Sequence, residues 1–250
     1  MSVLSLRGIT KSFGGLQALK GIDLDLEAGE ILALVGDNGA GKSTMTKIVS
    51  GVETADSGTI SVNGKPVSIR EPNDARAYGI ETLHQHLGLV NSFGVVENLF
   101  LGREITGTRL GVRYLKHGEM RERAKALMTS LGIRVPSLDR SVSTMSGGQR
   151  QAIAISRLLL NDVQVIIMDE PMAALGVDEG QKVLDLIVRL SKKNVALLVI
   201  SHNLEHVFSV AHRIAVFKNG GLVGVVRTSD VTRGDVTSMI INGTLPAAAA

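Results

Sequence analysis

The stretch Gly36-Asp37-Asn38-Gly39-Ala40-Gly41-Lys42-Ser43-Thr44 decides the fold of this chain. It fits the pattern G-x-x-x-x-G-K-[ST], a loop that wraps the phosphates of a nucleoside triphosphate. Its glycines let backbone N–H groups approach phosphate oxygens, and a following helix directs its free N–H groups at the same anion. Residues 30–35, which are apolar after Glu30, predict a strand before the loop, and residues 43–50 predict a helix after it. This strand–loop–helix order predicts a nucleotide site.

Two side chains of the loop have chemistry of their own. Lys42 is expected to reach the β- and γ-phosphates, and the Ser43 hydroxyl is expected to ligate Mg²⁺. The predicted ligands are therefore a nucleoside triphosphate and Mg²⁺.

A second stretch ends in two carboxylates. After Gln164, residues 165–168 form an apolar run that Asp169 and Glu170 follow, which is typical of a strand buried on both faces of a parallel sheet. Ligands bind at the carboxyl ends of such strands. Asp169 is a candidate for coordinating Mg²⁺, and Glu170 for the base that orients an attacking water. His202 follows the apolar strand predicted over 195–200, so we expect it at the same edge.

Composition limits the class of protein. The 250 residues suffice for one large domain or two small ones, and 44% hydrophobic with 20% charged residues is ordinary for a globular protein. Apolar runs reach about six residues, far short of the roughly 20 that span a bilayer. With no secretory pattern at the N-terminus, we expect a cytoplasmic protein that meets a membrane through a partner. The net charge is +3, but the basic residues are scattered along the chain and only 3% of the residues are aromatic. Both features argue against nucleic-acid binding.

Outside these motifs the chain alternates strands and helices. Residues 3–9 and 22–26 alternate apolar and polar side chains, as antiparallel strands do, and Phe13 between them is either a core residue or a ring that stacks on a nucleobase. Asn63-Gly64 is a hairpin corner. Residues 80–83 predict a strand that ends just before Gln85, and Asn219-Gly220-Gly221 joins strands predicted over 213–217 and 222–226.

From 95 to 155 the pattern is helical, and Met120, Ala124 and Met128 lie on one apolar stripe. Ser146-Gly147-Gly148-Gln149 interrupts this pattern and starts a second helix, whose N-terminus is a second place for an anion.

Together these motifs resemble the ATP-binding subunit of an ABC transporter over residues 3–240. Five occur in the family's order: the phosphate loop, Gln85, Ser146 to Gln149, the strand ending in Asp169-Glu170, and His202. The resemblance implies an α/β fold, a P-loop NTPase (ABC ATPase) core with an antiparallel β subdomain and a helical subdomain inserted at about 95–158. It implies a single domain over 3–240. The low-complexity end of the chain predicts a disordered tail over 241–250.

The resemblance also implies roles and partners. ATP and Mg²⁺ would be the cofactors, with Glu170, His202 and Gln85 catalytic, Ser43, Gln85 and Asp169 on the metal, and Phe13 on the adenine. Two copies would pair head to tail, so that Ser146 to Gln149 of one caps the γ-phosphate held by the other. The dimer would lie at the cytoplasmic face of the membrane, bound to permease subunits, and ATP would close it while hydrolysis reopens it.

A narrower likeness is to the single-domain ATPases of monosaccharide importers, which work as homodimers with an extracellular sugar-binding protein. Gly36-Asp37-Asn38, Ile80-Glu81-Thr82 and residues 97–104 carry it. The chain departs from the usual family pattern at Met145, Met172 and Gly176, the last of which replaces an aspartate that helps communication across the dimer. The alternatives are another importer class, a nucleic-acid-handling ABC ATPase and a non-hydrolysing regulator.

Overall fold

The structure is a computed structural model that describes residues 2–245 in two compact units. The first unit comprises the described residues up to Thr82, Val163–Pro171 and those from Ile187 onward, and the second comprises Leu83–Asp162 and Met172–Leu186. The predicted helical subdomain, 95–158, falls within the second unit. Part of the predicted tail, residues 246–250, lies outside the described residues.

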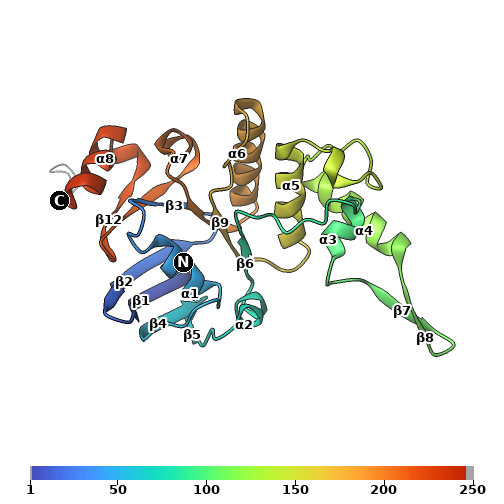
Figure 1. Cartoon of the computed structure of the whole chain (residues 1–250), viewed down its shortest axis with the longest axis horizontal. Helices are drawn as coiled ribbons and strands as arrows, with labels where there is room; N and C mark the ends of the chain where they lie inside the picture. Colours follow the sequence, from blue (N-terminus) through green and yellow to red (C-terminus); the bar gives the residue numbers. More distant parts are fainter. Residues whose placement is uncertain (1, 246–250) are drawn as a thin grey trace. The chain divides into compact units, whose positions relative to one another are not determined.

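A six-stranded sheet runs through the first unit (Figure 1). Its order is β12 (Gly221–Arg227), β11 (Arg213–Lys218), β3 (Ile31–Gly36), β10 (Ala196–Ile200), β9 (Val165–Asp169) and β6 (Ile80–Leu83). Strands β11, β3, β10 and β9 are mutually parallel, and β12 is antiparallel to β11. The apolar residues of β3, β9 and β10 are buried, which agrees with strands covered on both faces. The carboxyl ends of β3, β9 and β10 therefore meet at one edge.

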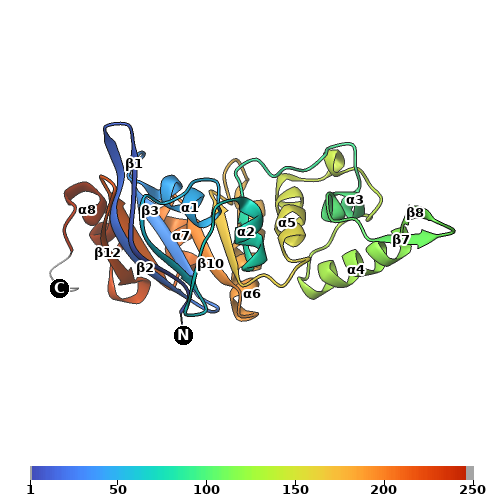
Figure 2. The ribbon, with the colours of Figure 1, turned by 90° about the horizontal axis from the view of Figure 1, so that it is seen from below.

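A second, antiparallel sheet belongs to the same unit. Its order is β2 (Leu16–Glu27), β1 (Ser2–Phe13), β4 (Ser57–Val62) and β5 (Lys65–Val67), and Asn63-Gly64 forms the predicted corner between the last two. Helix α1 (Lys42–Val49) shares one hydrophobic core with both sheets, in which Leu6, Leu34 and Met45 are fully buried. The phosphate loop thus joins a central strand to a core helix (Figure 2).

Three short helices complete the first unit: α2 (Pro72–Ala77), α7 (Leu204–Val210) and α8 (Arg233–Asn242). Helices α7 and α8 are not among the elements predicted from the sequence. Helix α8 ends at Asn242, where Gly243 adopts a left-handed conformation, so ordered structure continues past the predicted boundary at 240.

The second unit contains α3 (Val95–Phe100), α4 (His117–Ser130), α5 (Gly147–Leu158) and the first part of α6 (Val177–Lys192). Val95, Leu99, Met120, Met128 and Ile153 form its hydrophobic cluster. The prediction of helix throughout 95–155 is wrong in two places. Strands β7 (Thr106–Arg109) and β8 (Val112–Leu115) form an antiparallel hairpin, and residues 131–141 form a loop. Among the described residues, no helix combines the length and the apolar character needed to cross a bilayer.

Candidate active site

The phosphate loop follows β3 and takes a backbone path that two of its glycines make possible. Gly36 has φ 142°, and a Cβ on it would lie 2.2 Å from the carbonyl oxygen of Phe217. Gly41 has φ 106°, and a Cβ there would lie 2.8 Å from Cδ2 of Leu19. Since neither position tolerates a side chain, the loop is held tightly between β11 and the β2 strand.

The turn between β11 and β12 also holds the loop. The Gly220 N–H donates to the carbonyl oxygen of Ala40 at 3.1 Å, and the Lys20 N–H donates to the carbonyl oxygen of Gly220 at 2.8 Å. The sequence indicated a turn at Asn219-Gly220 but gave no sign of this contact, because it depends on how β11 aligns with β3.

Helix α1 starts at Lys42 without a side-chain cap. Its N-cap residue is Gly41, and no side chain there accepts a hydrogen bond from the first turn. Free N–H groups and the positive end of the helix dipole therefore remain for an anion.

Lys42 reaches back across the loop. Its Nζ donates to the carbonyl oxygen of Gly36 at 2.6 Å and to that of Asp37 at 2.9 Å. Burial lowers the pKa of Lys42, and the negative charges of Glu170, Asp37 and Asp169 act against that shift. The two carboxylates at the end of β9 thus lie within electrostatic reach of the loop lysine.

Glu170 and His202 are directly paired. Glu170 Oε1 accepts a hydrogen bond from the backbone N–H of His202 at 3.0 Å and contacts His202 Nδ1 at 2.8 Å. The β9–β10 register brings them together, because Asp169 pairs with Ile200 and each residue lies just beyond its strand. Glu170 also has φ 48°, a left-handed conformation that is uncommon for a glutamate, and backbone strain of this kind clusters at functional sites.

Phe13 ends β1 and is 44% exposed, so the core alternative is wrong. The Lys11 ammonium lies 5.4 Å from the centre of its ring. An exposed ring beside a cation is available for a flat aromatic ligand, which is the remaining prediction for Phe13.

The other predicted site residues belong to the second unit. Gln85 follows β6 and is exposed. Ser146 is the N-cap of α5: its side chain accepts from the Gln149 N–H, and the Gln149 side chain accepts from the Ser146 N–H. A Cβ on Gly147 would lie 2.8 Å from Leu175 Cδ2, and one on Gly148 would lie 3.1 Å from Glu179 Cβ. Packing of α5 against the start of α6 therefore accounts for both glycines before any ligand is considered.

The three departures from the family pattern are accommodated differently. Met145 and Met172 are buried, Met145 in the hydrophobic cluster of the second unit. Gly176 is exposed, and a Cβ there would have no neighbour within 4 Å. Sterically, position 176 would accept the aspartate that it lacks.

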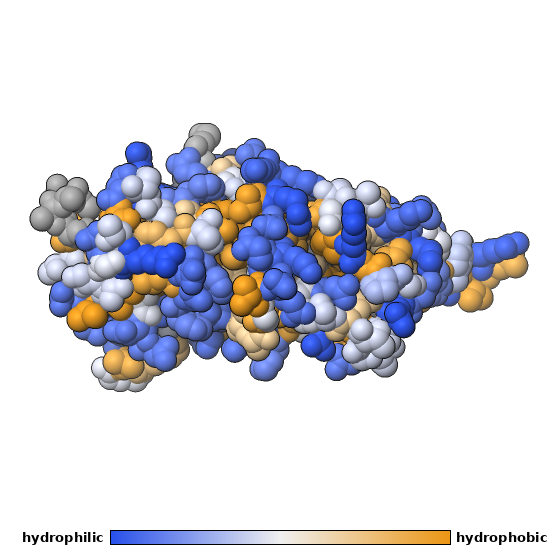
Figure 3. Space-filling view, turned by 90° about the horizontal axis from the view of Figure 1, so that it is seen from above, coloured by the Kyte–Doolittle hydropathy of each residue, from blue (hydrophilic) through white to orange (hydrophobic). Residues whose placement is uncertain are grey.

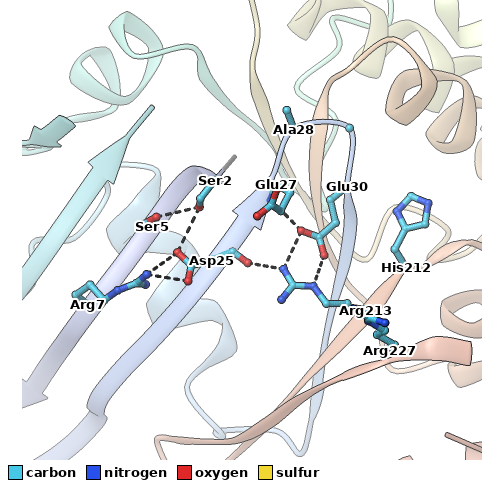
Figure 4. A pocket seen from close by; sticks show the side chains of 11 residues that line it. Ser2, Ser5, Arg7, Asp25, Glu27, Ala28, Glu30, His212, Arg213 and Arg227 are labelled. Atoms are coloured by element: carbon cyan, nitrogen blue, oxygen red, sulfur yellow. Dashed lines mark hydrogen bonds and ion pairs between the residues drawn. The ribbon is translucent and has the colours of Figure 1, made fainter. Parts of the chain in front are cut away.

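A separate groove of about 740 Å³ lies at the opposite end of β3 from the loop (Figure 4). Arg213 donates to Glu30 through Nε and through Nη2, and Arg7 donates to both carboxylate oxygens of Asp25 at 2.8 Å. In each of these two pairs the charges neutralise one another, so these four side chains are held by their partners and do not converge on a substrate. The phosphate loop, with its uncapped helix and nearby carboxylates, is the candidate active site.

The comparisons with known proteins agree with this geometry. A family model described as "ABC transporter" matches residues 19–173. The fructose import ATP-binding protein FrcA of Rhizobium meliloti is 41% identical over 248 residues, which cover 98% of this chain and 95% of that protein. The xylose/arabinose import ATP-binding protein XylG of Sulfolobus acidocaldarius is 41% identical over 238 residues, which cover 95% of this chain and 93% of that protein.

A solved structure of an ATP-binding cassette of an ABC transporter matches with a TM-score of 0.84 and 27% identity, over 97% of this chain and 98% of that one. The predicted α/β ABC ATPase fold is confirmed. The chain belongs to the ABC transporter family, in which it is an ATP-binding domain that hydrolyses ATP.

Proposed function

We propose that the chain is the motor subunit of a bacterial ABC importer and couples ATP hydrolysis to uptake of a small sugar through separate membrane subunits. Support comes from the relatives named for import of fructose and of xylose or arabinose, each matched along nearly its whole length. The observation that carries the ATPase role is the Glu170–His202 pair, within electrostatic reach of Lys42.

The residues present fit Mg²⁺. Ser43 offers a hydroxyl and Asp169 a carboxylate, and both are the oxygen ligands that this ion prefers. Within residues 2–245, no group of three or more His, Cys, Asp or Glu side chains could hold a metal, which suits an ion bound by one or two protein groups and substrate phosphates. Gln85 is the further ligand that we propose. Bound Mg²⁺ would offset negative charge on the phosphates.

Hydrolysis needs a base beside the γ-phosphate. We assign this role to Glu170, whose carboxylate orients a water and takes its proton as the water oxygen bonds to the γ-phosphorus and the bond to ADP breaks. His202 fixes Glu170 Oε1 through its backbone N–H and Nδ1, which leaves Oε2 for the water. Lys42 and the N–H groups of the loop balance the charge of the phosphate oxygens.

The assembly that we propose is a head-to-tail homodimer bound to permease subunits at the cytoplasmic face of the membrane, with a sugar-binding protein outside. The N-terminus of α5 at Ser146 to Gln149 would close over the γ-phosphate held by the other copy. ATP would then favour the closed dimer and hydrolysis the open one, and the permease would follow this equilibrium.

Glu170→Gln tests the ATPase role. The amide cannot accept the proton but keeps the shape of the side chain, so we expect ATP affinity within about twofold of wild type and a loss of turnover of about a hundredfold or more. Steady-state phosphate release and ATP titration measure the two quantities. Glu122→Gln, on the exposed side of α4, is the matched control and should turn over normally. Near-normal turnover by Glu170→Gln would remove the assigned role.

A further inference from the structure

The hairpin of residues 106–115 is the feature that the proposed function leaves unused. It extends away from the helices of its own unit, and in a space-filling view its end carries hydrophobic and hydrophilic residues side by side (Figures 1 and 3). Arg109 pairs with Val112, so Leu110 and Gly111 alone form the connection. Both have left-handed backbone, with φ 51° and 81°, which defines a type I′ turn.

Leu110 is an unusual residue for this turn. Between residues 2 and 245 the chain makes two other two-residue connections with positive φ at both positions, and each uses Asn-Gly: Asn63-Gly64 and Asn219-Gly220. Asparagine tolerates left-handed backbone, whereas a bulky side chain is disfavoured there. Leu110 is nevertheless 97% exposed, so its side chain gains nothing from packing. Folding of the hairpin does not explain a leucine at this place.

The rest of the hairpin is both apolar and basic. Val112, Tyr114 and Leu115 are exposed, and the Tyr114 ring lies flat over Gly107, where a Cβ would be 2.8 Å from Cζ. Residues 106–115 contain two arginines and no acid. Of these, Arg113 donates to Thr106 Oγ1 at 3.4 Å. Exposed apolar side chains grouped on one projection mark a contact surface.

We propose that this hairpin inserts its tip into the headgroup region of an anionic phospholipid surface. Leu110 and Val112 would enter the acyl boundary, Tyr114 would lie at the level of the headgroups, and Arg109 and Arg113 would meet the lipid phosphates. The charge argues for lipid over a permease loop, because cytoplasmic loops of membrane proteins are rich in Lys and Arg and would repel the hairpin. This contact is additional to the one through the permease.

Vesicle flotation of the purified full-length chain tests the proposal without a permease. We expect binding to vesicles of phosphatidylglycerol mixed with phosphatidylcholine, weaker binding to phosphatidylcholine alone, and a decrease as salt is raised. The doubly substituted Arg109→Gln, Arg113→Gln chain should bind roughly fivefold more weakly for each arginine lost.

Leu110→Asn separates lipid contact from folding. It installs the Asn-Gly turn that the chain uses elsewhere, so thermal stability should be equal or higher, while vesicle binding should fall about tenfold. Ile241→Asn, at a position 65% exposed on α8, is the matched control and should bind like wild type. The double arginine variant, Leu110→Asn and Ile241→Asn should all keep the wild-type ATPase rate. A negative result in the vesicle assay is therefore distinct from a failure of the proposed ATPase role.

Three results would overturn the proposal: no binding of the wild-type chain to anionic vesicles, equal binding to neutral vesicles, or binding that Leu110→Asn leaves unchanged. Loss of ATPase coupling in a reconstituted transporter by Leu110→Asn, with no vesicle binding by the wild-type chain, would assign the hairpin to the permease instead.

Discussion

Burial lowers the pKa of Lys42 from its ordinary value, and the nearby charges of Glu170, Asp37 and Asp169 offset that effect only in part. Because the folded-state pKa is below that of the unfolded chain, folding disfavours the ammonium form. This cost is fully present below the folded-state pKa, and it disappears as pH rises through the range between the two pKa values. Lys42 therefore serves a ligand at some expense of stability.

Lys42→Met tests whether Lys42 lowers the stability of the free protein while it strengthens ATP binding. At neutral pH we expect its free energy of unfolding without nucleotide to stay within about 1 kcal/mol of wild type or to exceed it, since a buried charge is removed. ATP affinity should fall by about tenfold or more, because charged hydrogen bonds to phosphate are lost. Thermal unfolding with and without ATP measures both: saturating ATP should raise the midpoint of the wild type and hardly shift that of the variant. An equal shift in both would refute the role of Lys42.

Residue identities at the site could be predicted from sequence, whereas their contacts could not. Lys42, Glu170 and His202 each occupy a position that strand–loop patterns mark. The hydrogen bond between Glu170 and His202 depends on the β9–β10 register, and the left-handed backbone of Glu170 has no signature in a non-glycine residue. Phe13 remained ambiguous because exposure is set by how β1 and β2 end, which a single aromatic residue does not reveal.

At the scale of elements, the start of α6 carries a glycine where the family usually has an aspartate. The Gly180 N–H donates to the Gly176 carbonyl oxygen at 2.8 Å, so Gly176 occupies the N-cap position. An aspartate caps a helix better than glycine by a few tenths of a kcal/mol, and a Cβ at 176 meets nothing within 4 Å.

Gly176→Asp should therefore leave the unfolding midpoint unchanged or slightly higher. We expect its effect in the ATP dependence of turnover, since the aspartate that the family usually carries at this position helps communication across the dimer. Differential scanning calorimetry and turnover as a function of ATP concentration separate the two outcomes. Gly118→Asp, which also meets nothing within 4 Å, controls for added charge. A drop in stability would contradict the N-cap assignment.

Elements with local signals were predictable, and those whose signals were weak or misleading were missed. Asn63-Gly64 and Asn219-Gly220 mark their hairpins because asparagine and glycine accept left-handed backbone. The hairpin at 106–115 was not predicted, because its turn has leucine at position 110 where the other two turns have asparagine. Leucine gives no turn signal, and the surrounding stretch is apolar and resembles a helix. Helix α8 does carry a local signal, because Thr232 and Asp235 form a capping box at its start.

At the scale of the molecule, the α1 N-terminus in one unit has no side-chain cap, and the α5 N-terminus in the other unit is capped by Ser146 and Gln149 of its own chain. The order of five motifs was enough to predict the family, because each motif is local in sequence. The distance between the α1 and α5 N-termini depends on how two copies of the chain assemble, so no local sequence pattern predicts it. We propose that the two come together on one nucleotide only between two copies of the chain.

The most direct test is ATPase turnover per chain over a range of protein concentrations, for wild type and for Ser146→Arg. A large cation at the α5 N-cap should block closure over the phosphate held by the other copy while sparing the phosphate loop. We expect wild-type turnover to rise with concentration toward a plateau, and Ser146→Arg to bind ATP normally and hydrolyse it at a small fraction of the wild-type rate. Turnover that is independent of concentration, and unaffected by Ser146→Arg, would contradict the composite site.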